Sequence, residues 1–246
     1  MQHRSKKIKK SFFIILVVLI VLSGGSAIYL GNYYHSVDVE KYMNGSSEVS
    51  VEKFDKGWFF DGAGEEKTLI FYPGAKVATE AYAPLMYQLA ESGIDCFLVD
   101  MPFHMAFFGM NRAEETMQEY NYEAWYLGGH SLGGAMAANF AADYVEDHTD
   151  GIRGLLLLAA YPTKDLSTSD MSVVTVYGSE DGVLNMDKIV AGRELMPQDY
   201  KEVCIEGGNH AQFGSYGAQK GDGTAAIPAE EQWARTVEVF VGDESE

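Results

Sequence analysis

The sequence predicts an α/β protein in which a mostly parallel sheet of about eight strands is flanked by helices on both faces. Strand-like runs alternate with helix-like runs along most of the chain, which is typical of such sheets. One run, 155–158, is uninterrupted leucine, as expected of a parallel strand buried on both faces. The composition agrees, because 47% of the residues are hydrophobic and 22% are charged, as in globular proteins.

The expected elements follow from these runs. Strands are expected at 48–54, 57–60, 68–72, 95–100, 125–127, 154–159, 173–177 and 202–205, and helices at 79–91, 133–146, 186–195 and 229–241. No helical pattern separates the first two strands, so the sheet is expected to begin with an antiparallel pair. The segment 101–120 is rich in Phe and Met before a polar helix. It is interpreted either as a short cap over an active site or as a surface helix with some core packing.

The amino-terminal part differs in character from the rest of the chain. Residues 1–10 are interpreted as a basic cytoplasmic head, 11–30 as a membrane anchor or signal segment, and 31–45 as a stalk. The remaining 46–246 form the expected folded domain. The positive-inside rule then predicts a single-pass protein of the cell membrane with the domain outside the cytoplasm, or a secreted protein if the segment is cleaved.

The charge excludes one class of partner. The net charge is −18, and five of the 18 basic residues lie in the first ten, so 13 basic residues face 36 acidic ones in the remainder, a net charge of −23. Such a body repels phosphate backbones, and no nucleic acid is expected as a partner. The scattered histidines predict no metal site. Cys96 and Cys204 are expected to be separate buried thiols, although a disulfide between them stays open.

The candidate nucleophile is Ser131. It is the centre of Gly129-His-Ser-Leu-Gly133, which matches the G-x-S-x-G pattern between an expected strand and an expected helix. A serine in such a tight turn has a strained backbone, and the residues two before and two after it must lack bulk. Gly129 and Gly133 meet this requirement. The alternative is an ordinary serine in a glycine-rich turn.

The candidate base and acid come from later loops. A serine hydroxyl attacks poorly without a base, and His210 follows the last expected strand, where parallel sheets build their sites. The carboxylate that would orient it is Asp181, with Glu180 as second choice. The backbone N–H groups of Leu132 and Ala75 are expected to form the oxyanion hole.

A glycine-rich run, 213–223, follows the candidate base. Gln212, Gln219 and Asp222 could hold the histidine loop by hydrogen bonds.

Several segments together resemble the α/β-hydrolase superfamily and, within it, the compact bacterial subgroup related to dienelactone hydrolases. The resemblance covers about 68–241. It rests on Phe71-Tyr-Pro-Gly-Ala-Lys76, Gly129-His-Ser-Leu-Gly-Gly134, Leu158-Ala-Ala-Tyr-Pro162, Tyr177-Gly-Ser-Glu-Asp-Gly182 and Gly207-Gly-Asn-His-Ala-Gln-Phe-Gly-Ser-Tyr-Gly217, in this order.

This resemblance implies an eight-stranded sheet and ester chemistry at a Ser–Asp–His triad without a cofactor. The chain order Ser131, Asp181, His210 is the order of this superfamily. Dienelactone hydrolases have a cysteine where this chain has Ser131, so the resemblance carries the fold and the triad but not the lactone substrate.

The predicted function is hydrolysis of small or amphipathic carboxylic esters through an acyl-enzyme, near the outer face of a membrane. An acyltransferase or peptidase with the same triad remains an alternative. A catalytically silent, membrane-tethered binding module is an alternative of another class. The sequence leaves the acyl group, the alcohol and the oligomeric state open.

Overall fold

The computed structural model describes residues 31–64, 67–148 and 151–242. The chain divides into two units, Met1–Tyr33 and Tyr34–Glu246, and the second contains the sheet. The predicted head and the predicted anchor or signal segment lie outside the described residues, so both stay predictions. Within the described ranges, no helix is long and apolar enough to cross a membrane.

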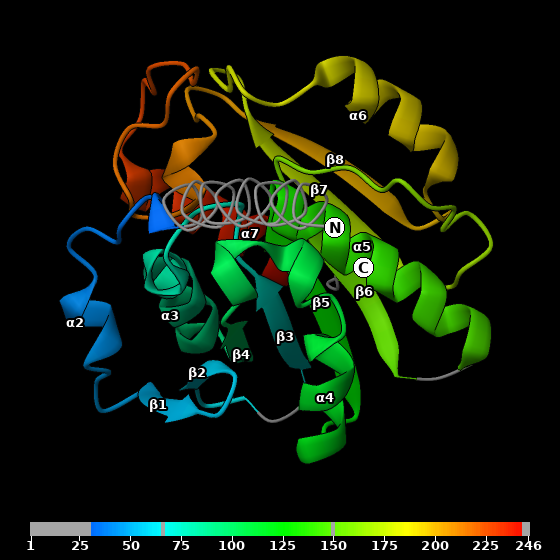
Figure 1. Cartoon of the computed structure of the whole chain (residues 1–246), viewed down its shortest axis with the longest axis horizontal. Helices are drawn as coiled ribbons and strands as arrows, with labels where there is room; N and C mark the ends of the chain where they lie inside the picture. The colour runs from blue at the N-terminus through cyan, green and yellow to red at the C-terminus, as the bar shows by residue number, and fades with distance from the viewer. Residues whose placement is uncertain (1–30, 65–66, 149–150, 243–246) are drawn as a thin grey trace, which may run out of the picture. The chain divides into compact units, whose positions relative to one another are not determined.

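The sheet has eight strands in the order β1-β2-β4-β3-β5-β6-β7-β8 (Figure 1). The strands are β1 (Ser50–Phe54), β2 (Gly57–Asp61), β3 (Lys67–Tyr72), β4 (Ile94–Val99), β5 (Ala124–His130), β6 (Ile152–Leu158), β7 (Ser172–Gly178) and β8 (Tyr200–Ile205). β2 pairs antiparallel with β1 and β4, and every other pair is parallel. The predicted fold class, including its antiparallel beginning, is confirmed.

Helices cover both faces of this sheet (Figure 1). They are α2 (Glu40–Met43), α3 (Ala83–Glu91), α4 (Arg112–Glu119), α5 (Leu132–Asp147), α6 (Met186–Gly192) and α7 (Ala229–Val241). Short 3₁₀ turns occupy Thr79–Tyr82, Pro102–His104, Ala106–Phe108, Arg193–Leu195 and Ala211–Phe213. Buried side chains of α2, α3 and α7 share one core cluster, and those of α4 and α5 share the other.

The side chains of β3 alternate between the two core clusters. Leu69 and Phe71 belong to the cluster with α3 and α7, whereas Ile70 and Tyr72 belong to the cluster with α5. Successive strand residues point to opposite faces, so a central strand covered on both sides must be apolar throughout. Because β3 to β8 are parallel, the loops at their carboxyl ends meet at one edge, called here the carboxyl rim.

The stalk predicted for 31–45 is wrong from Tyr34 onward. Tyr34 forms a bridge with Val77, the loop after β3. Val39 and Tyr42 are buried, and the Tyr42 ring lies edge-on to Trp233 of α7 with centroids 6.1 Å apart. These apolar side chains gain more from packing on the domain than from exposure in a stalk.

The two cysteines are free thiols, so no disulfide forms between them. Cys96 on β4 is buried as expected, but Cys204 is exposed. The expectation of burial was wrong for Cys204 because β8 is the last strand of the sheet that the described residues form.

Candidate active site

The backbone at Ser131 is strained. Its φ is 53° and its ψ is −122°, between the end of β5 and the start of α5. Its N–H donates to the Leu158 carbonyl at 2.8 Å, which fixes the turn against β6. A Cβ on Gly133 would lie 2.1 Å from the Tyr72 carbonyl oxygen, and one on Gly129 would lie 2.6 Å from the Gly133 carbonyl carbon. The glycines are therefore required by close backbone approach, which is the steric reason given by the motif.

The structure brings Asp181 and His210 together. Asp181 Oδ2 lies 2.8 Å from His210 Nδ1, and both side chains are only 2% exposed. The other carboxylate oxygen accepts from the N–H groups of Val183 and Leu184, each at 2.8 Å. An ionised carboxylate only accepts, so Nδ1 carries the proton and Nε2 keeps a free lone pair.

Glu180, the second choice for the acid, is exposed and accepts from the Ser179 hydroxyl instead. Of the two candidate acids, Asp181 is therefore the one in contact with His210.

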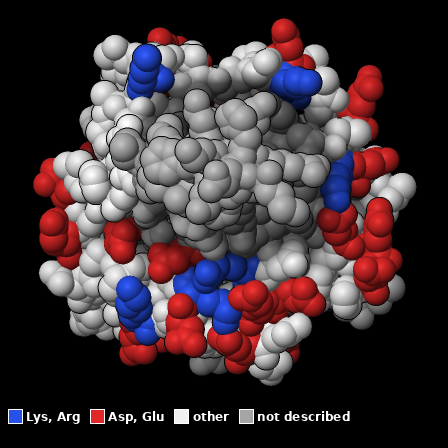
Figure 2. All heavy atoms as spheres, viewed as in Figure 1, with Lys and Arg blue, Asp and Glu red and all other residues white. Residues whose placement is uncertain are grey.

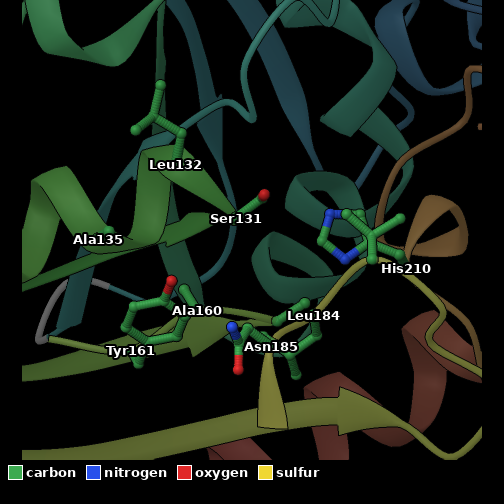
Figure 3. Close-up of a pocket in the computed structure, with 10 residues that line it drawn as sticks. Ser131, Leu132, Ala135, Ala160, Tyr161, Leu184, Asn185 and His210 are labelled. Atoms are coloured by element: carbon green, nitrogen blue, oxygen red, sulfur yellow. The ribbon is translucent and has the colours of Figure 1, made fainter. Parts of the chain in front are cut away.

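Ser131 and His210 line one pocket of about 240 Å³ at the carboxyl rim. Figure 3 shows the serine hydroxyl and the imidazole facing each other across it, with Leu184 and Asn185 beside them. Its apolar walls come from Ala135, Ala159, Ala160, Val183 and Leu184. Among the lining residues that the structure describes, none is an Asp, Glu, Lys or Arg. None comes from 101–120, so the interpretation of that segment as a cap over the site gains no support.

The segment 101–120 packs on the sheet instead. Ala113 and Thr116 of α4 are fully buried, and the N–H of Ala113 donates to the Tyr72 hydroxyl. The alternative interpretation, a surface helix with some core packing, describes it better.

The two predicted oxyanion donors lie at the rim. Leu132 begins α5 and lines the pocket. Ala75 lies in the loop after β3 but is not among the lining residues. Among the described residues, neither N–H donates a hydrogen bond to another group of the protein. The first N–H groups of a helix also carry its positive dipole end.

Asp222 joins the acid loop to the histidine loop. Its Oδ1 accepts from the N–H groups of Gly182 and His210 at 3.1 and 3.2 Å, and its Oδ2 accepts from Ala211 at 2.8 Å. The suggested hydrogen-bonding role of Asp222 is confirmed. Gln219 instead accepts from the Tyr216 hydroxyl.

A second histidine, His130, forms a buried hydrogen-bond network next to the turn at Ser131. The Tyr82 hydroxyl accepts from the Gly74 N–H at 3.0 Å and lies 2.7 Å from His130 Nδ1. This links the loop that carries Ala75 to the residue before Ser131. No short-range pattern points to Tyr82, because the contact spans 48 residues.

Burial lowers the pKa of His130 well below 6.5, and the neighbouring His210 lowers it further. The ring centroids of the two histidines are 4.4 Å apart. A neutral His130 can pack against His210 without repelling a positive charge there.

Comparisons with known structures show the same architecture. The chain is similar to carboxyl esterase 2 of Tuber melanosporum (13% identity, TM-score 0.60, 85% of this chain and 89% of that one). It is also similar to a carboxylesterase of Bacillus subtilis (8% identity, TM-score 0.53, 83% and 96%) and to a hydrolase from Agrobacterium vitis (13% identity, TM-score 0.58, 79% and 98%). At these identities the likeness concerns the fold.

A comparison of the sequence with curated proteins finds no match. The sequence profile described as the alpha/beta hydrolase family, however, matches residues 68–234, which is more than half of the chain. The matched range runs from β3 into α7 and includes the strained serine, the buried carboxylate and its histidine. The chain therefore belongs to the alpha/beta hydrolase family of enzymes.

Proposed function

We propose that the chain is a carboxylic ester hydrolase with a Ser131–His210–Asp181 triad and a covalent acyl-enzyme intermediate. The observation that carries this proposal is the buried 2.8 Å contact between Asp181 and His210 beside the pocket that Ser131 lines. The carboxylate holds Nδ1 protonated and aims Nε2 at the pocket, as a general base requires.

The chemistry follows from these positions. His210 Nε2 takes the hydroxyl proton while Ser131 Oγ bonds to the ester carbonyl carbon, and the carbonyl oxygen becomes an oxyanion near the N–H groups of Leu132 and Ala75. Collapse breaks the bond to the alcohol oxygen, which takes the proton from His210. A water molecule then repeats the sequence, releasing the acid and restoring Ser131.

The pocket favours a short, uncharged acyl group. Its volume is about 240 Å³ and its walls are largely alanine and branched aliphatic side chains without a formal charge. Several proteins with the same fold are described as esterases, which supports ester substrates here. The relation to the dienelactone hydrolase subgroup belongs to this proposal and rests on the quoted motifs, with serine as nucleophile.

We also propose that 11–30 anchors the enzyme in the cell membrane with the domain on the extracytoplasmic side. Secretion after cleavage of this segment is the alternative, and the mass of the mature chain distinguishes the two.

A fluorophosphonate probe tests the nucleophile. Labelling is expected for the wild type and for Ser92→Ala, which removes an exposed serine far along the chain, but not for Ser131→Ala. Persistent labelling of Ser131→Ala would refute the assignment.

A panel of p-nitrophenyl esters and amides tests the reaction. Faster cleavage of amides than of esters would favour a peptidase. Transfer of the acyl group to an added alcohol would favour an acyltransferase. The absence of both turnover and labelling would favour a silent binding module.

A further inference from the structure

The exposed apolar side chains gather at the carboxyl rim. The large hydrophobic residues with 39% to 65% exposure in the described ranges are Val37, Phe103, Phe107, Phe108, Val183, Met186 and Val190. Scattered single residues of this kind are ordinary, but a group on one side of a molecule marks an interaction surface.

All members of this group except Val190 are located at the rim by their chain position or by a backbone contact. The three phenylalanines follow β4, and their rings contact one another with centroids 5.5 and 5.7 Å apart. Val183 and Met186 follow β7, and Val183 also lines the pocket, whereas Val190 lies further along α6.

Val37 reaches the same rim from the amino-terminal side. Its N–H donates to the carbonyl of Ser215, in the loop after β8. The opposite edge of the sheet has no exposed large hydrophobic residue among those described. The apolar surface and the candidate active site therefore share one side of the domain.

The chain also enters the domain at this rim. The Tyr34 N–H donates to the Lys76 carbonyl, and the Lys76 N–H donates to the His104 carbonyl, each at 2.7 Å. Tyr34 is thus two hydrogen bonds from the phenylalanine segment. The predicted membrane segment ends at residue 30, and four extended residues reach about 14 Å. A membrane anchor that ends at residue 30 would therefore keep Tyr34, at this rim, within about 14 Å of the bilayer surface.

The charge indicates which kind of partner fits. Figure 2 shows acidic side chains, with a smaller number of basic ones among them, around the margin of the face that it draws, in keeping with the net charge of −23 after residue 10. A nucleic acid or a strongly acidic protein would be repelled. A lipid surface accepts exposed Phe and aliphatic side chains at its acyl boundary without needing positive charge.

We propose that the carboxyl rim, led by Phe103, Phe107 and Phe108, inserts into the interface of a lipid bilayer and presents the pocket to esters that reside in the membrane. The proposed bilayer contact follows from the exposed apolar side chains, whereas the proposed membrane-resident substrate rests on the proposed ester hydrolase function. Amphipathic esters would reach Ser131 from the lipid phase, with their acyl group entering the pocket beside Val183.

Fluorescence quenching tests the contact in the full chain, reconstituted in phosphatidylcholine vesicles with brominated acyl chains. The reporter is Phe107→Trp, because Phe107 is the most exposed of the three at 65%. The matched control is Arg153→Trp, an exposed position at the opposite end of β6. Quenching of the first beyond the wild-type background, with none at the second, supports the proposal. Equal quenching of both, or of neither, overturns it.

Activity tests the consequence. Phe107→Ser combined with Phe108→Ser is expected to lower the rate on an ester of a long-chain alcohol dissolved in the vesicles by about tenfold or more. The rate on water-soluble p-nitrophenyl acetate should stay within about twofold, since neither residue lines the pocket. An equal change on both substrates contradicts the proposal. If the wild type hydrolyses neither ester, the proposed function fails, while the quenching result still decides whether the rim meets lipid.

Discussion

The two sides of the candidate active site are held in different ways. On the serine side, the backbone itself fixes the geometry, through the left-handed φ of Ser131 and the contacts of Gly129 and Gly133. On the histidine side, side chains from distant positions fix a loop. Asp222 accepts from the backbone of His210, and Gln232 of α7 both accepts from and donates to the backbone of Asn209.

This difference shows that one part of a site can be specified by neighbouring residues and another by residues far apart in the sequence. A five-residue motif is enough to point to the nucleophile, because the positive φ of Ser131 and the need for small residues at Gly129 and Gly133 belong to one short turn, although that turn packs against β3 and β6. His210 and its neighbour Asn209 need partners 12 and 23 residues further along the chain, respectively, so the position of the base depends on the folded loops around it.

The largest expected effect concerns the serine side. Ser131→Ala should lower kcat by about 10⁴-fold or more, without a loss of stability, since alanine keeps the same strained backbone. Ser131→Gly should be equally inactive but more stable than Ser131→Ala by about 1 kcal/mol, because glycine relieves the strain at φ 53°. Ester hydrolysis and urea unfolding measure both. Equal stability of the two variants would show that the turn is not strained.

On the histidine side, Asp222→Ala should lower kcat by about 10- to 100-fold, since the loop that carries His210 shifts. It should also cost about 2 kcal/mol, because the N–H groups of Gly182, His210 and Ala211 lose a charged acceptor. Asp187→Ala, which removes an exposed acid from α6, is the charge-matched control and should change neither quantity much. Similar activity of the two variants would mean that the loop holds its shape without Asp222.

A smaller effect is expected from a change in the hydrogen-bond network around His130. Tyr82→Phe leaves the Gly74 N–H and His130 Nδ1 without their shared hydroxyl, so the loop that carries Ala75 is less well positioned. We expect a loss of kcat of about three- to tenfold, with KM little changed. Tyr216→Phe, another buried tyrosine with one side-chain hydrogen bond, is the control. A loss confined to KM would assign Tyr82 to substrate binding instead.

The smallest effect is a change in the pH dependence of stability. His130 has a lowered pKa when folded, so below its unfolded pKa of about 6.5 protons bind preferentially to the unfolded chain. Above that pH, His130 does not lower the free energy of unfolding. Below it, His130 lowers the free energy of unfolding by up to about 1.4 kcal/mol per pH unit. His130→Asn should therefore have a flatter dependence of unfolding free energy between pH 7 and 5. The same slope in both proteins would mean that His130 is protonated in the folded state.

Much of the fold could be predicted because its signals are short-range. The buried parallel strands are continuous apolar runs, the expected strand at 173–177 lies within β7 (Ser172–Gly178), and the expected helix at 229–241 has the bounds of α7. The candidate triad could be predicted because each member follows a strand end, and parallel strand ends meet at one edge.

The sequence by itself determined the order of strands and helices and the strained turn at Ser131, since both depend on neighbouring residues and on steric limits of the backbone. Only the tertiary structure decided that 34–45 packs on the domain, that Cys204 is exposed, and that Tyr82 contacts His130. The physical reason is that burial and long-range hydrogen bonds depend on which distant surfaces meet. Tyr42 is buried because Trp233, 191 residues later, lies against it.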